Sequence, residues 1–216
     1  AVMVAPIGVE STFRGVVLLL EQEALVWEGD ETGAKYTRGP IPEELKAQVE
    51  TERHQLIEKI AETDDTLLEK YLAGEALTVK ELKVALRQAT IEYKLVPIFC
   101  GSSLRNKGVQ PLLDAIVDYL PSPVDIPPAE GENPKTGAKE ERRPDQGESF
   151  SALAFKIQTD PHVGKLTYIR VYSGKLPSGS YVYNATKRER ERVGRLLLMH
   201  ANQREEISEA VAGEIV

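Results

Sequence analysis

The sequence has little of what covalent cross-links, metal sites or membrane spans require. It holds one cysteine among 216 residues, which excludes an internal disulfide and a multi-cysteine metal site. Its three histidines have no metal-binding spacing, and no apolar run approaches the length that spans a bilayer. The first residues show neither the basic nor the apolar part of a signal peptide. We therefore expect a soluble, monomeric, cytoplasmic protein that has no metal site.

What the sequence does contain predicts a folded chain. With 41% hydrophobic and 28% charged residues, it can form one large or two ordinary domains. A net charge of -7 argues against a protein that coats nucleic acid over its whole surface, although a local basic face remains possible. The chain begins without Met and ends in the strand-like run Gly213–Val216, so we expect a piece of a longer protein.

The first half predicts two short strands followed by helices. Residues 1–8 and 15–20 are short apolar runs next to turn signals. A long acidic amphipathic helix is expected from Ile41 onward, a shorter segment at 67–72, and a further helix after the capping-box pattern Thr78–Glu81. The apolar faces of the first and third helices are expected to consist of Leu45, Val49, Leu56 and Ile60, and of Leu82, Ala85, Leu86 and Ala89.

The helical region is acidic, with twelve acidic residues against seven basic ones between Glu43 and Glu92. On charge alone, a solvated helical face explains this pattern better than a partner surface does.

A strand, a loop and a helix follow. The run 95–100 has the composition of a buried parallel strand, although Pro97 cannot donate to a ladder, and Cys100 is expected to be a small buried hydrophobe. After the loop comes a helix whose apolar face is Leu112, Leu113, Ile116, Val117 and Leu120. The segment Pro121–Gly147 is rich in proline and charge, which predicts a domain boundary.

Beyond Ser149 the pattern predicts a small antiparallel β-barrel. From Ser151 to Arg204 there are ten basic residues against three acidic ones. If Arg188, Arg190 and Arg192 alternate on a strand, they share a face that suits a phosphate backbone. The alternative is an exposed strand that its charges keep soluble.

The loop CGSSLRNKGV at 100–109 allows several kinds of chemistry. A serine nucleophile at Ser102 or Ser103 is disfavoured, because the second glycine of the nucleophile elbow is missing and no spacing points His54, His162 or His200 at the loop. The remaining interpretation is recognition of a ligand by backbone N–H groups at the carboxyl end of a strand.

Several long stretches resemble bacterial-type translation elongation factor G, in the right order and over nearly the whole chain. They are AVMVAPIG, LLEKYLAGEALT, CGSSLRNKGVQPLLDAIVDYLPSPVDIP, FKIQTDPHVGKLTYIRVYSGKLPSGSYVYN and MHANQREE. The resemblance implies an α/β plus β fold. Residues 1–121 are then the C-terminal part of a P-loop-type GTPase domain with an α+β helical insertion at about 11–92. A linker at 122–148 and an incomplete antiparallel barrel at 149–216 follow.

The resemblance also implies roles for particular residues. Ser102, Ser103 and Leu104 occupy the Ser-Ala-Leu loop, whose backbone N–H groups face the guanine O6 atom, with Ser103 in the usual place of Ala. The helical insertion is expected to meet the ribosomal stalk protein through Glu50, Glu58 and Glu62. The barrel is expected to contact ribosomal RNA through Arg188, Arg190, Arg192 and Arg195.

The phosphate-binding pattern Gly-x-x-x-x-Gly-Lys-Ser/Thr is missing from the sequence. The run Asn106–Val109 only imitates the Asn-Lys-x-Asp motif, because Val109 cannot pair with guanine. We expect GTP or GDP with Mg in the parent GTPase only, and no catalytic residue, cofactor or activity in this chain alone. The alternatives are a stand-alone, non-enzymatic ribosome- or RNA-binding module and a serine hydrolase.

Overall fold

The computed structural model describes residues 1–27, 33–134, 136–160, 164–201 and 203–216. The chain divides into two compact units, Ala1–Leu120 and Pro121–Val216. Each unit is described by itself.

The first unit contains a four-stranded antiparallel sheet in the order β1-β2-β3-β4. Its strands are β1 (Val4–Ile7), β2 (Gly15–Leu18), β3 (Glu23–Val26) and β4 (Thr37–Gly39). The two strands predicted near the N-terminus are confirmed as β1 and β2. Because each strand pairs with its neighbour in sequence, the sheet is a simple meander.

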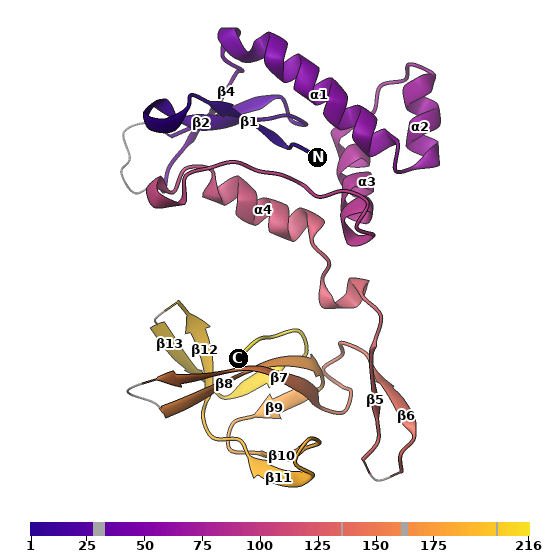
Figure 1. Cartoon of the computed structure of the whole chain (residues 1–216), viewed down its shortest axis with the longest axis vertical. Coiled ribbons are helices and arrows are strands. Elements are labelled where there is room, and N and C mark those ends of the chain that lie inside the picture. The colour runs from indigo at the N-terminus through magenta and orange to yellow at the C-terminus, as the bar shows by residue number, and fades with distance from the viewer. Residues whose placement is uncertain (28–32, 135, 161–163, 202) are drawn as a thin grey trace. The chain divides into compact units, whose positions relative to one another are not determined.

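The described part of this unit also contains the helices α1 (Lys46–Ala61), α2 (Asp65–Leu72), α3 (Val79–Ile91) and α4 (Val109–Tyr119), with 3-10 turns at Glu10–Thr12, Glu43–Leu45 and Ser103–Arg105. In Figure 1, α1 runs along one side of the sheet and α4 along the other. Val49, Leu56 and Ile60 of α1 are buried as predicted, and they join the sheet residues in one core.

The capping box predicted for α3 is confirmed. The Thr78 hydroxyl accepts from the Glu81 N–H at 3.2 Å, and the Glu81 carboxylate accepts from the Thr78 N–H at 2.9 Å. The other carboxylate oxygen of Glu81 lies 2.6 Å from the Lys70 ammonium. Hydrogen bonds from Lys70 and Thr78 lower the pKa of Glu81 to about 2. The predicted face Leu82, Ala85, Leu86 and Ala89 is buried.

The predicted buried strand at 95–100 is wrong for most of its length. Only Ile98 pairs, through a single parallel bridge to Val2, and Val96 is 68% exposed. Pro97 has no N–H for a ladder, and no second strand lies on the other side of this segment in the described structure. Cys100 is exposed rather than buried for the same reason.

The apolar face predicted for α4 is also wrong, although the helix itself is confirmed. The helix buries the narrow stripe Pro111, Ala115 and Tyr119 at a spacing of four residues, and it packs against α3. Burial raises the pKa of Tyr119 to about 12. The residues of the predicted face are between 43% and 77% exposed. They are Leu112, Leu113, Ile116, Val117 and Leu120.

The second unit is built from antiparallel strands after a 3-10 turn at Pro123–Asp125. The hairpin of β5 (Ala129–Glu132) and β6 (Lys139–Arg142) lies within the segment expected to be a linker. The remaining strands are β7 (Ser151–Asp160), β8 (Gly164–Ser173), β9 (Lys175–Pro177), β10 (Tyr181–Asn184), β11 (Glu189–Arg192), β12 (Leu196–His200), β13 (Gln203–Ile207) and β14 (Glu209–Val211).

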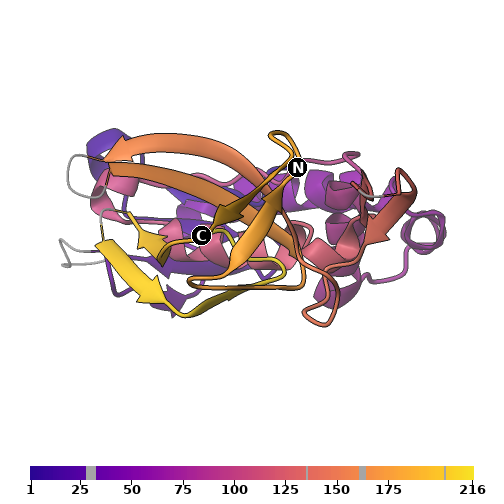
Figure 2. The same cartoon turned by 90° about the horizontal axis from the view of Figure 1, so that it is seen from below.

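The antiparallel pairing predicted beyond Ser149 is confirmed, but the strands form separate two-stranded ladders. These are β7-β8, β9-β14, β10-β11 and β12-β13. Register shifts interrupt the long β7-β8 pair, which is curved in Figure 2 and lies between the β12-β13 and β10-β11 hairpins in Figure 1. A small core joins them, consisting of Val171, Leu176, Leu196, Ala210 and Val216.

Candidate functional site

The loop at 100–109 is a closed turn with a defined backbone. The Ser102 N–H donates to the Lys107 carbonyl at 2.8 Å, and the Lys107 N–H donates back to the Ser102 carbonyl at 3.0 Å. Asn106 and Gly108 both adopt left-handed backbone angles, with φ of 51° and 82°, and Gly108 caps the start of α4. The tip of the turn faces solvent, since Leu104 is 93% exposed.

The backbone donors of this loop differ in availability. Ser103 and Leu104 open a 3-10 turn, and N–H groups at the start of a helix have no carbonyl partner within it. Over the described part of the chain, no other acceptor reaches them either. The Ser102 N–H, in contrast, is used within the turn. The predicted base contact therefore falls on Ser103 and Leu104, while Ser102 holds the turn closed.

Residues far away in sequence, in segments that connect the strands of the sheet, contact the loop and the start of α4. The Lys107 ammonium donates to the Phe13 carbonyl at 3.3 Å. The carbonyl of Gly33 accepts from the Trp27 indole at 3.2 Å and from the Gln110 side chain at 2.8 Å. A methyl group on Gly33 would lie 2.5 Å from the Arg105 carbonyl oxygen. Sequence reasoning missed Gly33 and Gln110, because neither residue belongs to a recognisable pattern.

These contacts agree with the interpretation of Asn106–Val109 as an imitation of the Asn-Lys-x-Asp motif. Lys107 is an anchor for the loop, and Val109 is the first residue of α4. Neither residue is arranged to pair with a base edge.

The structure gives no support to a nucleophilic serine. The His54 ring lies 3.4 Å from the Tyr71 hydroxyl, and His200 lies 3.4 Å from a Glu205 carboxylate oxygen. His162 lies outside the described residues. Within the described ranges, no group of His, Cys, Asp and Glu is placed to hold a metal ion. The same residues include no helix that is both long and apolar enough to cross a membrane.

The predicted row of arginines is only partly on a strand. Arg190 and Arg192 alternate on β11 and share a face. Arg188 lies in the turn before β11, with a left-handed φ of 58°, and Arg195 follows the strand. All four side chains are exposed, and in the described structure none of them pairs with a carboxylate.

Of the predicted stalk-contact residues, Glu50 and Glu58 lie on α1, and Glu62 is the C-cap residue directly after it. Glu50, Glu58 and Glu62 follow one side of the helix at steps of eight and four residues, with exposed His54 between the first two. No ion pair to these three glutamates is present in the parts of the chain that are described. The helix therefore offers an exposed acidic stripe.

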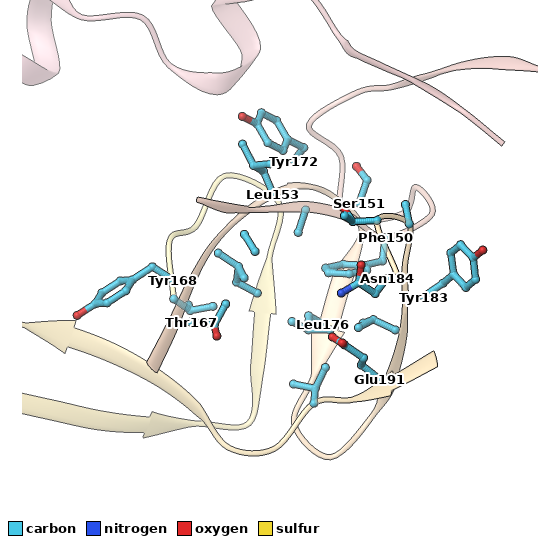
Figure 3. A pocket seen from close by; sticks show the side chains of 18 of the residues that line it. Phe150, Ser151, Leu153, Thr167, Tyr168, Tyr172, Leu176, Tyr183, Asn184 and Glu191 are labelled. Atoms are coloured by element: carbon cyan, nitrogen blue, oxygen red, sulfur yellow. The ribbon is translucent and has the colours of Figure 1, made fainter. Parts of the chain in front are cut away.

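An open cavity of about 1460 Å³ lies within the second unit, between the β7-β8 pair and the hairpins. Figure 3 shows Asn184 and Glu191 turned toward it and Tyr183 turned away. Hydrogen bonds from Lys187 and Asn184 hold the pKa of Glu191 below its ordinary value. The walls are otherwise largely apolar, with Phe150, Leu176, Val182 and Leu196 among them.

Comparison with known proteins assigns this unit. Residues 149–216 match the family described as Elongation factor G domain 2. The second unit is therefore a β domain of the translation-factor class. A crystal structure of a protein from Thermus thermophilus matches 99% of this chain at 28% sequence identity, with a TM-score of 0.74.

Residues 149–216 therefore belong to the family of elongation factor G domain 2. The chain covers 29% of the Thermus thermophilus protein.

Proposed function

We propose that this chain acts in protein synthesis as part of a ribosomal translocase GTPase. In this proposal the loop at Ser103 and Leu104 contacts the guanine base, the acidic stripe of α1 meets the ribosomal stalk protein, and the β domain contacts ribosomal RNA. The observation that carries the proposal is the pair of unpartnered N–H groups on a closed turn directly before α4. The match of residues 149–216 to elongation factor G domain 2 supports the same role.

The loop geometry suits guanine and disfavours adenine. Guanine presents an O6 acceptor, whereas adenine presents an amine donor at the corresponding position. A backbone N–H facing an amine makes no hydrogen bond, which costs about 1–3 kcal/mol when the group is buried. The contact is made by the backbone, so the Ser103 hydroxyl does not interfere with it.

The chain fits a base but not the phosphates or Mg of a nucleotide. Phosphoryl transfer depends on a phosphate loop, its lysine and the metal, and the 216 residues contain no such loop. Two N–H contacts contribute about 1–3 kcal/mol in total, whereas association costs at least about 4 kcal/mol. We expect this chain alone to bind GDP more weakly than millimolar and to release no phosphate from GTP.

The test is an amide NMR titration of the chain with GDP at about 10 mM, with ADP as the matched control. We expect the Ser103 and Leu104 signals to shift with GDP only, and the Ser102 signal to move less because its N–H is already bonded. Isothermal titration and a phosphate-release assay with ribosomes present complete the measurement. Guanine-selective binding at micromolar concentration would show that other residues form the pocket. Equal shifts of these signals with ADP would refute the proposed contact with the guanine base.

The stalk contact has its own test. Adding unlabelled stalk C-terminal domain to the isotope-labelled chain at low salt should shift α1 amides, and salt should weaken the effect because the stripe is charged and exposed. A Glu50→Gln, Glu58→Gln, Glu62→Gln variant should lose most of the shift. Unchanged α1 signals at low salt would leave the stripe as a solvated face.

The alternative of a stand-alone RNA-binding module shares the exposed arginines of β11. It predicts RNA binding without any GDP-specific shift at Ser103 and Leu104, so the NMR titration separates the two proposals.

A further inference from the structure

The hairpin of β10 and β11 places two tyrosines and two arginines on one face. Tyr181 is paired with Arg192, and Tyr183 with Arg190. Residues directly opposite each other in a ladder project to the same side, and residues two apart on a strand do so as well. We name this set the tyrosine–arginine face. The opposite face of the hairpin carries Val182, Asn184, Glu189 and Glu191.

Both tyrosines of this face are exposed to solvent. Tyr181 is 59% exposed and Tyr183 is 47% exposed. Large aromatic surface that remains in water favours a partner able to cover it. Tyr183 is among the residues that line the cavity, but Figure 3 shows its ring pointing away from it.

The charge of this face is positive and uncompensated. The Arg190 guanidinium lies over the Tyr181 ring, 5.1 Å from its centre, and within the described residues no carboxylate pairs with Arg190 or Arg192. The nearby carboxylates are on the other face, where Glu191 and Glu189 lie 2.7 Å and 3.8 Å from the Lys187 ammonium. A local positive face on a chain of net charge -7 points to an anionic partner.

We propose that the tyrosine–arginine face binds single-stranded RNA by stacking unpaired bases on Tyr181 and Tyr183, while Arg190 and Arg192 contact the phosphates. This rests on the proposed contact between the β domain and ribosomal RNA. Aromatic rings and arginines arranged together are the means by which proteins hold single strands without reading their sequence.

The spacing of residues along a strand decides between single-stranded and double-stranded RNA. Positions two apart on a strand are separated by about 6.6 Å, whereas stacked bases in a duplex rise by about 3.4 Å. A base can therefore lie on each ring only if neighbouring bases are unstacked. In a duplex, neighbouring bases also cover each other's flat faces. A duplex can therefore contact only the two arginines and not the tyrosine rings.

The experiment measures binding of the 216-residue chain to a fluorescent oligouridine dodecamer and to an RNA duplex of equal length, over a series of salt concentrations. The variants are Tyr181→Leu, Tyr183→Leu, their combination, and Arg190→Gln with Arg192→Gln. Tyr93→Leu is the matched control, because Tyr93 is 91% exposed and lies in the first unit. Far-UV circular dichroism checks that each variant keeps its strands.

We expect each tyrosine substitution to weaken dodecamer binding about ten-fold. Duplex affinity and the salt dependence should not change, because no charge is removed. The arginine variant should weaken both RNAs. It should also reduce the salt slope for the dodecamer by about 1.4, because each of the two arginine–phosphate pairs contributes about 0.7 to that slope. Tyr93→Leu should bind like the unchanged chain.

The outcomes separate the two proposals. If the tyrosine variants bind the dodecamer normally while the arginine variant binds poorly, stacking is wrong and the RNA contact stands. If the unchanged chain binds neither RNA, the proposed RNA contact fails as well. If an oligoglutamate displaces the dodecamer at equal charge concentration, the face fits acidic peptides and the RNA assignment is overturned.

Discussion

Tight packing of the loop at 100–109 can be tested with three glycine substitutions that separate backbone angle from close contact. Gly74→Ala adds a side chain at a left-handed φ of 74° with nothing within 4 Å. Gly101→Ala adds one at an ordinary φ, 2.7 Å from the Lys107 carbonyl oxygen. Gly108→Ala combines both effects, with a φ of 82° and a distance of 3.0 Å to the Cys100 carbonyl oxygen.

The geometry gives an order for the loss in free energy of unfolding. A left-handed angle costs about 1–2 kcal/mol, and alanine recovers about 0.4–1 kcal/mol by stiffening the unfolded chain, so Gly74→Ala should lose about 1 kcal/mol. Overpacking costs about 1–3 kcal/mol, and the same gain of about 0.4–1 kcal/mol from the unfolded chain applies, so Gly101→Ala should lose about 1–2 kcal/mol. Gly108→Ala should lose about 2–4 kcal/mol, because it carries both penalties.

The assay is urea unfolding followed by tryptophan fluorescence. Trp27 is the sole tryptophan of the sequence and is 2% exposed, so its emission reports the first unit alone. It also donates to Gly33, which lies against the loop, so its local environment senses the same contacts. If Gly101→Ala and Gly108→Ala are no less stable than Gly74→Ala, the loop is not tightly packed and the reasoning is refuted.

Three further predictions use the same fluorescence readout. Thr78→Ala should lower the free energy of unfolding by about 1 kcal/mol through loss of the helix cap, and an unchanged midpoint would contradict this. The pKa of Glu81 is about 2 when folded, below its ordinary 4.5, so its contribution to the free energy of unfolding is fully present above pH 4.5 and is lost as the pH falls toward 2. Glu81→Gln should therefore make stability depend less on pH in this range, and an unchanged pH profile would argue against the lowered pKa. Leu86→Ala should lower the free energy of unfolding by about 2–5 kcal/mol because Leu86 is fully buried. Leu72→Ala should lower it little, because Leu72 is 76% exposed. Equal losses for the two variants would contradict the assigned core.

Local patterns predicted the helices well. The Thr78–Glu81 box and the apolar spacing of α3 depend on neighbours within one or two turns, and the structure reproduces both. The antiparallel β texture beyond Ser149 is equally local, since most of its strands pair with the next strand in sequence.

Burial was harder to predict, because it depends on what covers a surface. The residues of 95–100 and the apolar face of α4 have the composition of a core, yet Val96, Ile98 and the predicted face of α4 are exposed, and Leu95 and Phe99 are only partly buried against the core. The shared face considered for Arg188, Arg190 and Arg192 depended on all three alternating on one strand, and the left-handed angle of Arg188 puts it in the turn before β11.

The loop at 100–109 was found by its resemblance to a family, and its chemistry needed the structure. Composition indicated only a backbone contact. Which donors are open depends on the Ser102–Lys107 pair, and a hydrogen bond between residues five apart in a loop leaves no sequence pattern.

The pairing of strands with their sequence neighbours has a consequence for how the chain is made. Every ladder between described strands joins consecutive strands except β9-β14, which must wait until the chain from Pro177 to Glu209 is complete. Contacts close in sequence form quickly because little loop entropy is lost in making them. During synthesis, the meander of the first unit and the hairpins β5-β6, β7-β8 and β10-β11 can each form soon after their residues leave the ribosome. Closure of β9 with β14 should be the slow step of the second unit, and a polypeptide stalled before Glu209 should expose the edge of β9 to aggregation.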